Sequence, residues 1–506
     1  MDMDISLSWL DWVIVIAYLA GMIYIGLFFR KKNHNFEDYF LASKGITMPL
    51  LIGTLVSTFF GLDTLFGTSE IGFFEGVTGF FAYALPYTAM YILMALIAPK
   101  FRELNSNTLS DIMAENYGQT ARIVSALASF FYSTNAMEIM GMGFIFALLL
   151  KIPYWQAVLL AAVIVVVYTY TGGLWAVATT DMIQFFIMAV SLGIALLICW
   201  EDLGGYAGVH AGLEAYLGED PWYYFSPSGG YLTLGVIIAY ALTSLAVLCE
   251  PAFMQRIFAS RSPRDVRTAL LISTPIWTAY EFACCMLGMA AVAAAGLDMI
   301  GETHANQALL AVVIKYLPTG LIGFFLAGVL AAAMSTADSY FLVSSGNLVY
   351  DIYRPLFKPD MPDQKMVAYT KKAVLIAAAI SVALSFYFDR IMGVWVFQAS
   401  MIINTIIIPL YAAVFLKKLK KTRLSGTLAT LVGFCGTIGY YIAISVLGSY
   451  SEEWETLVME VNLFGRSYEL WQEYGIFLIP PFVLLAYIAG LIFGREKREK
   501  ATGEAV

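Results

Sequence analysis

The sequence predicts an all-α integral membrane protein with about thirteen transmembrane helices. Hydrophobic residues make up 60% of the 506 residues and charged residues only 13%, whereas soluble domains carry about 25% charged residues. The apolar runs are long enough to cross a bilayer as helices, which takes ~20 residues each. Basic residues are confined almost entirely to every second connection between these runs, as expected of a chain that crosses the membrane at each run.

The predicted spans follow one another along a single transmembrane domain, residues 1–506. They cover residues 10–30, 47–72, 76–98, 119–150, 154–171, 174–199, 231–258, 265–296, 319–349, 366–387, 389–416, 424–446 and 472–494. We find no appended soluble domain and no phosphate-binding P-loop in the sequence. An ATP-driven pump is therefore disfavoured.

The distribution of basic residues predicts the orientation of the chain. If the N-terminus lies outside, the inside connections hold 25 of the 29 lysines and arginines, and only Lys151, Lys315, Arg390 and Arg466 lie outside. The inside connections are 30–44, 100–122, 256–267, 354–372, 417–423 and 495–500. We therefore expect a multi-pass protein of the plasma (inner) membrane with a cytoplasmic C-terminus.

One predicted span is interrupted near its middle. The stretch 53–72 reads GTLVSTFFGLDTLFGTSEIG, with four glycines and Asp63. Glycine weakens a helix interior by about 1 kcal/mol relative to alanine, and a carboxylate at the bilayer centre costs at least ~2.5–3.5 kcal/mol. A broken helix at this depth, with free carbonyls and one acid, indicates a binding site for a cation.

Six acids lie within predicted spans, away from the span ends. They are Asp63, Glu138, Asp181, Glu250, Glu281 and Asp338. The sequence places no lysine or arginine at comparable depth. Six acids without basic partners cannot all stay ionised in a low-dielectric environment unless cations neutralise them, so we expect bound cations or protonated acids.

Three stretches of the chain resemble the sodium/solute symporter family, which includes proline, sugar and sialic-acid symporters. The first is EDYFLA at 37–42, and the second is GGxxAVxxTDxxQ at 172–184. The third is AxxST at 332–336, followed by DxY at 351–353. The three stretches span most of the chain and follow the family's order.

The resemblance implies a LeuT-type fold with a 5+5 inverted repeat. A leading helix and loop (1–46) would precede a first repeat (47–199) and a second repeat (231–416), and two trailing helices (424–494) would follow. The first core helix is then the broken stretch 53–72. Its inverted partner is 231–258, interrupted at Glu250 and Pro251, where proline removes a backbone donor. Two interrupted helices at corresponding positions indicate a transporter site.

The resemblance also implies a sodium site. Its ligands would be the carbonyls of Val56, Phe59 and Ala332 and the hydroxyls of Ser335 and Thr336. Sodium, a hard cation, prefers such oxygens. The alternative is that the small hydroxyl residues only let helices pack closely. We expect no other metal and no further cofactor, because the three histidines and five cysteines lack metal-ligand spacing. All five cysteines lie in or at the ends of apolar runs, so we expect them to be thiols of the core.

A second ion position is implied near Asp181, Asp338 and Ser339. Asp181 corresponds to a family carboxylate near a second ion. Asp338 stands where several relatives have serine. It could strengthen an ion site or carry a proton, so sodium and proton coupling both stay open.

The substrate residues are expected around the broken helices. Asp63 corresponds to a family position that contacts substrate, and the other candidates are Phe60, Tyr132, Glu138, Glu250 and Gln398. Phe59 and Trp395 are additional aromatic candidates. Acids combined with aromatic rings suit an ammonium group.

We therefore expect a non-enzymatic symporter that uses the sodium gradient to import a small organic cation, such as a polyamine, another amine or a basic amino acid. One alternative keeps the fold but carries a zwitterionic amino acid or a monocarboxylate. Another is a transporter-like sensor. The expected partners are the solute, sodium and the bilayer, with no nucleic acid and no obligate protein partner.

Overall fold

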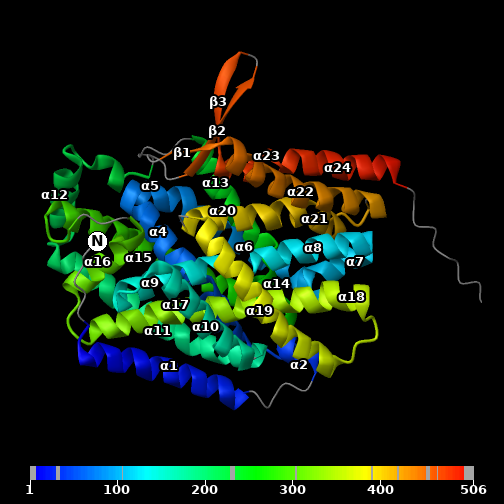
Figure 1. Ribbon diagram of the computed structural model, residues 1–506, viewed down its shortest axis with the longest axis horizontal. Coiled ribbons are helices and arrows are strands. Elements are labelled where there is room, and N and C mark those ends of the chain that lie inside the picture. Colours follow the sequence, from blue (N-terminus) through cyan, green and yellow to red (C-terminus); the bar gives the residue numbers. More distant parts are fainter. Residues whose placement is uncertain are drawn as a thin grey trace, which may run out of the picture.

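The long helices of the computed structural model run roughly parallel to one another (Figure 1). The structure describes residues 7–29, 35–104, 106–171, 173–227, 234–301, 305–388, 391–418, 421–451, 456–463 and 465–494. In Figure 1, α12 and α16 lie at one end of the bundle, on the left, and α2, α7 and α18 lie at the other. The described parts of the predicted inside connections 30–44, 100–122 and 354–372 thus lie at one end. We call it the α2 end.

The first part of the chain forms twelve helices within the described residues. They are α1 (Trp9–Phe29), α2 (Phe36–Leu41), α3 (Met48–Phe59), α4 (Leu62–Glu75), α5 (Val77–Gly79), α6 (Leu85–Glu103), α7 (Leu109–Tyr117), α8 (Gln119–Tyr132), α9 (Ala136–Leu150), α10 (Tyr154–Thr171), α11 (Leu174–Asp202) and α12 (Gly205–Leu217). The short connections are typical of antiparallel neighbours.

The second part adds further helices and one small sheet. The helices are α13 (Leu234–Thr243), α14 (Pro251–Ala259), α15 (Pro263–Gly296), α16 (Ala305–Tyr316), α17 (Leu321–Gly346), α18 (Arg354–Phe357), α19 (Asp363–Tyr387), α20 (Ile391–Ile402), α21 (Ile408–Phe415), α22 (Arg423–Leu447), α23 (Gly475–Leu478) and α24 (Pro480–Phe493). Strands β1 (Ser449–Ser451), β2 (Thr456–Leu463) and β3 (Arg466–Trp471) pair antiparallel in that order. In Figure 1 they project from the top of the bundle.

The helices confirm the predicted fold class but not the number of spans. Among the described residues, ten helices are long and apolar enough to cross a membrane, or eleven if the bent pair α3–α4 is one span. The apolar stretches of α1 and α10, Trp9–Ile25 and Tyr154–Val167, are shorter. Thirteen spans, and the inverted repeat that relates 47–199 to 231–416, stay predictions.

Both predicted helix breaks are present. Helix α3 ends at Phe59 and α4 begins at Leu62, with a bend of 52° between them. Before the second break, α13 tightens into a 3-10 turn over Ser244–Leu248, and α14 restarts at Pro251. Proline suits this first helical position because its missing N–H needs no partner there.

Some sequence-based expectations need correction or cannot be followed. Cys435, expected among the core thiols, is exposed, whereas the other four cysteines are buried. Gly172 of the second family stretch and Arg390 lie outside the described residues, as do the basic residues at 30–32, 420 and 495–500.

Helices α4 and α15 pack backbone to backbone through two glycines. A Cβ at Gly288 would lie 2.0 Å from the Ser69 carbonyl oxygen, and one at Gly72 would lie 2.3 Å from the Cys285 carbonyl oxygen. Small residues at helix contacts let backbones approach closely in a membrane. This contact holds α4, which carries Asp63, against α15.

We expect Gly288→Ala to push α4 away from α15 and to destabilise the protein by about 1–3 kcal/mol, as overpacking does. Samples are heated to a series of temperatures, and size-exclusion chromatography in detergent then measures how much of the monodisperse peak is lost. Gly439→Ala is the control, because a Cβ there meets no described atom within 4 Å. Equal thermal stability of the two variants would contradict the close contact.

Candidate functional site

A small closed cavity lies beside the break between α3 and α4. It is lined by Phe59, Asp63, Thr64, Tyr87, Tyr91, Tyr132, Val247, Glu281, Tyr340 and Trp395. These residues come from α3, α4, α6, α8, the 3-10 turn before α14, α15, α17 and α20. The cavity has about 10 Å³ of free space, room for about one water molecule. We call it the central cavity.

Aromatic side chains form most of the wall of the central cavity. Tyr87 and Trp395 have ring centroids 5.5 Å apart, and Tyr132 and Tyr340 have centroids 6.0 Å apart. The ring of Phe59 meets that of Tyr91 edge-on, at an interplanar angle of 84°. Rings packed against one another in this way present a rigid aromatic enclosure to a solute.

Two acids complete the wall, Asp63 from α4 and Glu281 from α15. Asp63 Oδ1 and Glu281 Oε2 are buried and have no hydrogen-bond partner among the described residues. Neither acid takes part in the ion pairs found within the described part of the chain. Buried carboxylates normally have a cationic or hydrogen-bonding partner, so these two oxygens are unsatisfied acceptors in the cavity wall.

Glu138 lies at the amino end of α4 rather than in the cavity wall. Both of its carboxylate oxygens accept the Leu62 N–H at 3.0 Å. A Cβ on Gly61 would lie 2.2 Å from Glu138 Oε1, 2.3 Å from Asp63 Oδ1 and 2.9 Å from Thr336 Oγ1. The break therefore requires glycine at residue 61. It also brings two carboxylates and one hydroxyl around the same point.

The predicted sodium residues meet where α17 crosses the end of α3. Ser335 Oγ lies 3.0 Å from the carbonyl oxygens of Ser57 and Ala332, and Thr336 Oγ1 donates to the Thr58 carbonyl at 3.0 Å. Val56 and Phe59, the predicted carbonyl ligands, flank Ser57 and Thr58 in the chain.

The carbonyls at the end of α3 are not all free. The Phe59 carbonyl accepts the Thr64 hydroxyl at 3.0 Å, and the Ser57 carbonyl accepts the Phe60 N–H at 3.3 Å. Because Phe60 bonds to Ser57, the Val56 carbonyl loses its usual donor four residues ahead. The oxygens needed for a sodium site are gathered here, and the exact ligand set stays a prediction.

The expectation that no basic residue lies as deep as the six acids is wrong. Arg256 is fully buried. Its guanidinium donates to the Ala252 carbonyl at 3.0 Å and approaches Asp181 Oδ2 at 3.5 Å. Since α14 begins only at Pro251, Arg256 lies inside this short helix and not in the following loop.

Arg256 joins the residues of the predicted second ion position. It also donates to Thr54 Oγ1 at 2.9 Å and to the Ser339 hydroxyl, and Thr54 Oγ1 donates to Asp181 Oδ2 at 2.5 Å. Ser339 Oγ lies 3.3 Å from Asp338 Oδ1. Asp181, Asp338 and Ser339 thus form one buried cluster, in which Arg256 supplies one positive charge.

Only Asp63 and Tyr132 of the six predicted substrate residues line the central cavity. Phe60 stacks on Tyr280, with ring centroids 3.6 Å apart. Glu250 accepts the N–H groups of Ala252 and Phe253 and caps α14. Gln398 donates to the Phe131 carbonyl at 3.2 Å.

Sequence reasoning missed several cavity residues as substrate candidates. They are Thr64, Tyr87, Tyr91, Val247, Glu281 and Tyr340. Tyr83, Tyr87 and Tyr91 recur every four residues, which places them on one face of a helix. This spacing, together with the buried charge of Glu281, is the signal that could have found part of the wall.

Comparison with known proteins identifies the family. The profile described as "Sodium:solute symporter family" matches residues 39–433. The chain is 25% identical over 386 residues to the "Sodium/pantothenate symporter" of Haemophilus influenzae, covering 73% of this chain and 78% of that protein. It is 24% identical over 434 residues to the human "High affinity choline transporter 1", covering 80% and 72%.

A solved structure shows the same fold. A Na⁺-coupled sialic acid symporter in a substrate-bound outward-open state superposes with a TM-score of 0.74 at 15% identity, covering 97% of this chain and 99% of that one. This likeness confirms the LeuT-type fold expected from the sequence, and the family match confirms the predicted resemblance. The chain therefore belongs to the sodium:solute symporter family and is a multi-pass, sodium-coupled solute symporter.

Proposed function

We propose that this symporter imports a small organic cation, such as an amine, together with sodium. The observation that carries the proposal is the wall of the central cavity, where Asp63 and Glu281 lie among six aromatic residues next to the predicted sodium residues. An ammonium group gains charge-assisted hydrogen bonds from the carboxylates and cation–π contacts from the rings. No lysine, arginine or histidine lines this cavity within the described residues.

The relatives do not decide the charge of the solute. One is named for choline, a cation, and another for pantothenate, an acid. The cavity chemistry is therefore the stronger guide. A carboxylate solute would meet two acids without a basic partner, whereas a cation neutralises them in a low-dielectric site.

The buried cluster supports a second ion position as part of this proposal. Asp338 Oδ2 and Asp181 Oδ1 have no hydrogen-bond partner in the described part of the chain. With Ser339, they would hold a second cation or a proton. A zwitterionic amino acid or monocarboxylate carried with protons is the second candidate, and Asp338 favours it. We further propose that the protein lies in the plasma (inner) membrane and that its α2 end faces the cytoplasm.

A solute screen tests the charge of the cargo. Tritiated choline, putrescine and arginine are compared with tritiated proline and pantothenate in proteoliposomes, with and without a sodium gradient. We expect sodium-dependent uptake of at least one of the first three. Uptake confined to proline or pantothenate would overturn the cationic proposal and leave the symporter assignment intact.

We expect Ser335→Ala with Thr336→Ala to raise the sodium concentration for half-maximal uptake at least about tenfold. Each of the two substitutions removes one predicted oxygen ligand from the ion, and such an interaction with a charged group contributes ~1.5–3 kcal/mol. Ser344→Ala on the same helix is the control, since this hydroxyl donates to the Phe341 carbonyl at 3.2 Å. An unchanged sodium dependence in the folded double variant would place the coupling ion elsewhere.

We expect Asp63→Asn to weaken binding of a cationic solute several hundredfold, because losing one partner of a buried charge pair costs ~3–5 kcal/mol. Sodium binding measured alone, by thermal shift against sodium concentration, should survive. Glu281→Gln should act in the same direction. Parent-like affinity of both variants for the transported solute would argue that these acids are structural.

Uptake should also be strongly electrogenic. A cation that enters with sodium carries at least two positive charges, and the membrane potential contributes ~2.3 kcal/mol per charge per 100 mV. Clamping the potential of proteoliposomes with potassium and valinomycin measures this dependence. Uptake that does not respond to an inside-negative potential would exclude this stoichiometry, unless protons leave in exchange.

A further inference from the structure

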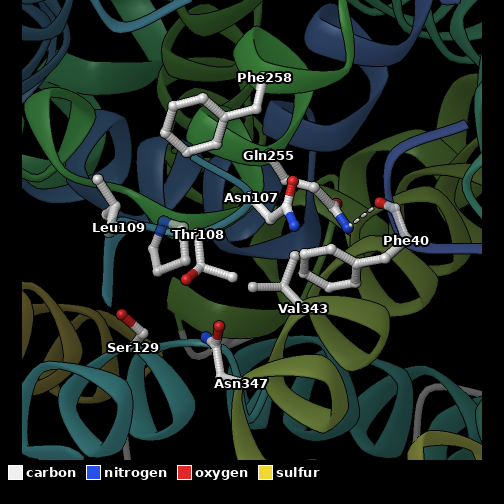
Figure 2. A pocket seen from close by; sticks show the side chains of 10 residues that line it. Phe40, Asn107, Thr108, Leu109, Ser129, Gln255, Phe258, Val343 and Asn347 are labelled. Atoms are coloured by element: carbon white, nitrogen blue, oxygen red, sulfur yellow. Dashed lines mark hydrogen bonds between the residues drawn. The ribbon is translucent and has the colours of Figure 1, made fainter. Parts of the chain in front are cut away.

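Figure 2 shows a second space, which we call the inner chamber. Phe40 of α2 and Asn107, just before α7, are among the residues that line it, so it lies toward the α2 end. Its polar lining includes Asn107, Thr108, Ser129, Gln255 and Asn347, and the ring of Phe40 closes one side. In contrast to the central cavity, its lining among the described residues contains no charged side chain. The chamber is as small as the central cavity, with about 10 Å³ of free space.

Three segments lead directly from one space to the other. On α8, on α17 and along the 3-10 turn into α14, a residue of the central cavity is followed three or four positions away by a residue of the inner chamber. On α8 and α17 this spacing is about one helical turn, or ~5.4 Å, whereas Val247 and Pro251 lie on either side of the second helix break. The pairs are Tyr132 and Ser129, Tyr340 and Val343, and Val247 and Pro251.

Two tyrosines stand at this boundary. Tyr132 and Tyr340 line the central cavity, and each precedes or follows a chamber residue by one turn on its own helix. Their rings lie 6.0 Å apart at an angle of 44°. Side-chain rotation of these two rings would join the spaces without unfolding a helix.

The inner chamber contains polar atoms that are prepared for a ligand. Ser129 Oγ, Gln255 Oε1 and Asn347 Nδ2 are buried and have no hydrogen-bond partner in the part of the chain that is described. Their residues are only 2%, 2% and 3% exposed. Buried polar atoms are rarely left unpaired, so three around one space indicate that a polar group binds there during part of the cycle.

Figure 2 shows a polar contact beside the chamber as a dashed line. Gln255 Nε2 donates to the Phe40 carbonyl at 2.8 Å, which ties α14 to α2. Nearby, the Ile46 N–H donates to the Ala259 carbonyl at 3.2 Å. Movement of α2 away from α14 would therefore open the chamber toward the α2 end.

We propose that the inner chamber is a second, weaker binding site, here called the station, which the transported solute occupies on its way to the cytoplasm. This rests on the proposed function for the solute and its direction. Ser129 Oγ and Gln255 Oε1 can accept hydrogen bonds and so replace some of those that a polar cation loses on leaving the central cavity, whereas Asn347 Nδ2 can only donate, to an acceptor group of the solute. These neutral groups do not reproduce the attraction of Asp63 and Glu281, so the solute is held less tightly and is released.

Cysteine labelling tests the station without reference to the cargo. Ser129→Cys and Asn347→Cys are placed in a variant whose native cysteines are replaced by serine, and inside-out vesicles are treated with a trimethylammonium methanethiosulfonate. We expect both cysteines to react at least about tenfold faster than Ser344→Cys. The control hydroxyl belongs to the same helix as Asn347 but does not line the chamber. Reaction no faster than the control would overturn the proposal.

The second test measures transport by protein that keeps its native cysteines. We expect Ser129→Ala with Asn347→Ala to lower the maximal uptake rate about fivefold, the usual effect of losing a hydrogen bond, while solute and sodium affinities stay within twofold of the parent. Ser344→Ala should change neither. A parent-like rate, or equal losses of rate and affinity, would overturn the station.

The two proposals fail separately in this experiment, since both tritiated choline and tritiated proline are used as probes. If the parent carries proline and not choline, the cationic cargo is wrong, and the station is still tested with proline. If the parent carries choline and the double variant behaves like it, only the station is wrong. If neither probe is carried, the cysteine-labelling result alone decides whether the proposed site in the inner chamber stands.

Discussion

The structure depends on how the interrupted helix α3–α4 satisfies its backbone groups where no bulk water is available. Backbone N–H and C=O groups left unpaired inside a membrane cost several kcal/mol each. Here the Leu62 N–H is paired with Glu138, and the carbonyls of Ser57 and Thr58 are paired with the hydroxyls of Ser335 and Thr336. Two of the groups that close the break, the hydroxyls of Ser335 and Thr336, are also expected to bind sodium, which would link ion binding to the geometry of the break.

Charge is arranged differently on the two sides of this break. In the buried cluster, Asp181 has the guanidinium of Arg256 at 3.5 Å, so that part of the site carries its own cation. In the central cavity, Asp63 and Glu281 have no such partner among the described residues. Under the proposed function, a positively charged solute supplies the missing charge in the central cavity, and Gly61 brings Asp63 close to Thr336, one of the predicted sodium residues.

The sequence was informative where local chemistry alone decides the structure. The glycines of 53–72 and Pro251 located both breaks, because glycine and proline act on their own segment. The depth of Arg256 was missed because it depends on where α14 restarts. Tyr87, Tyr91 and Glu281 were not assigned to the cavity, since their side-chain directions follow from the rotation of α6 and α15, which span boundaries do not specify.

The roles of Glu138 and Glu250 give a separate argument about the solute. Half-helix amino ends carry a partial positive charge and are the usual binding places for anionic groups in transporters with broken helices. Both such ends are already occupied here: Glu138 accepts the Leu62 N–H at the start of α4, and Glu250 caps α14. A solute carboxylate would have to displace one of the protein's own carboxylates to reach either end. Capping by these two glutamates therefore supports the proposal of a cationic solute, because it fills the two positions that would otherwise attract an anion.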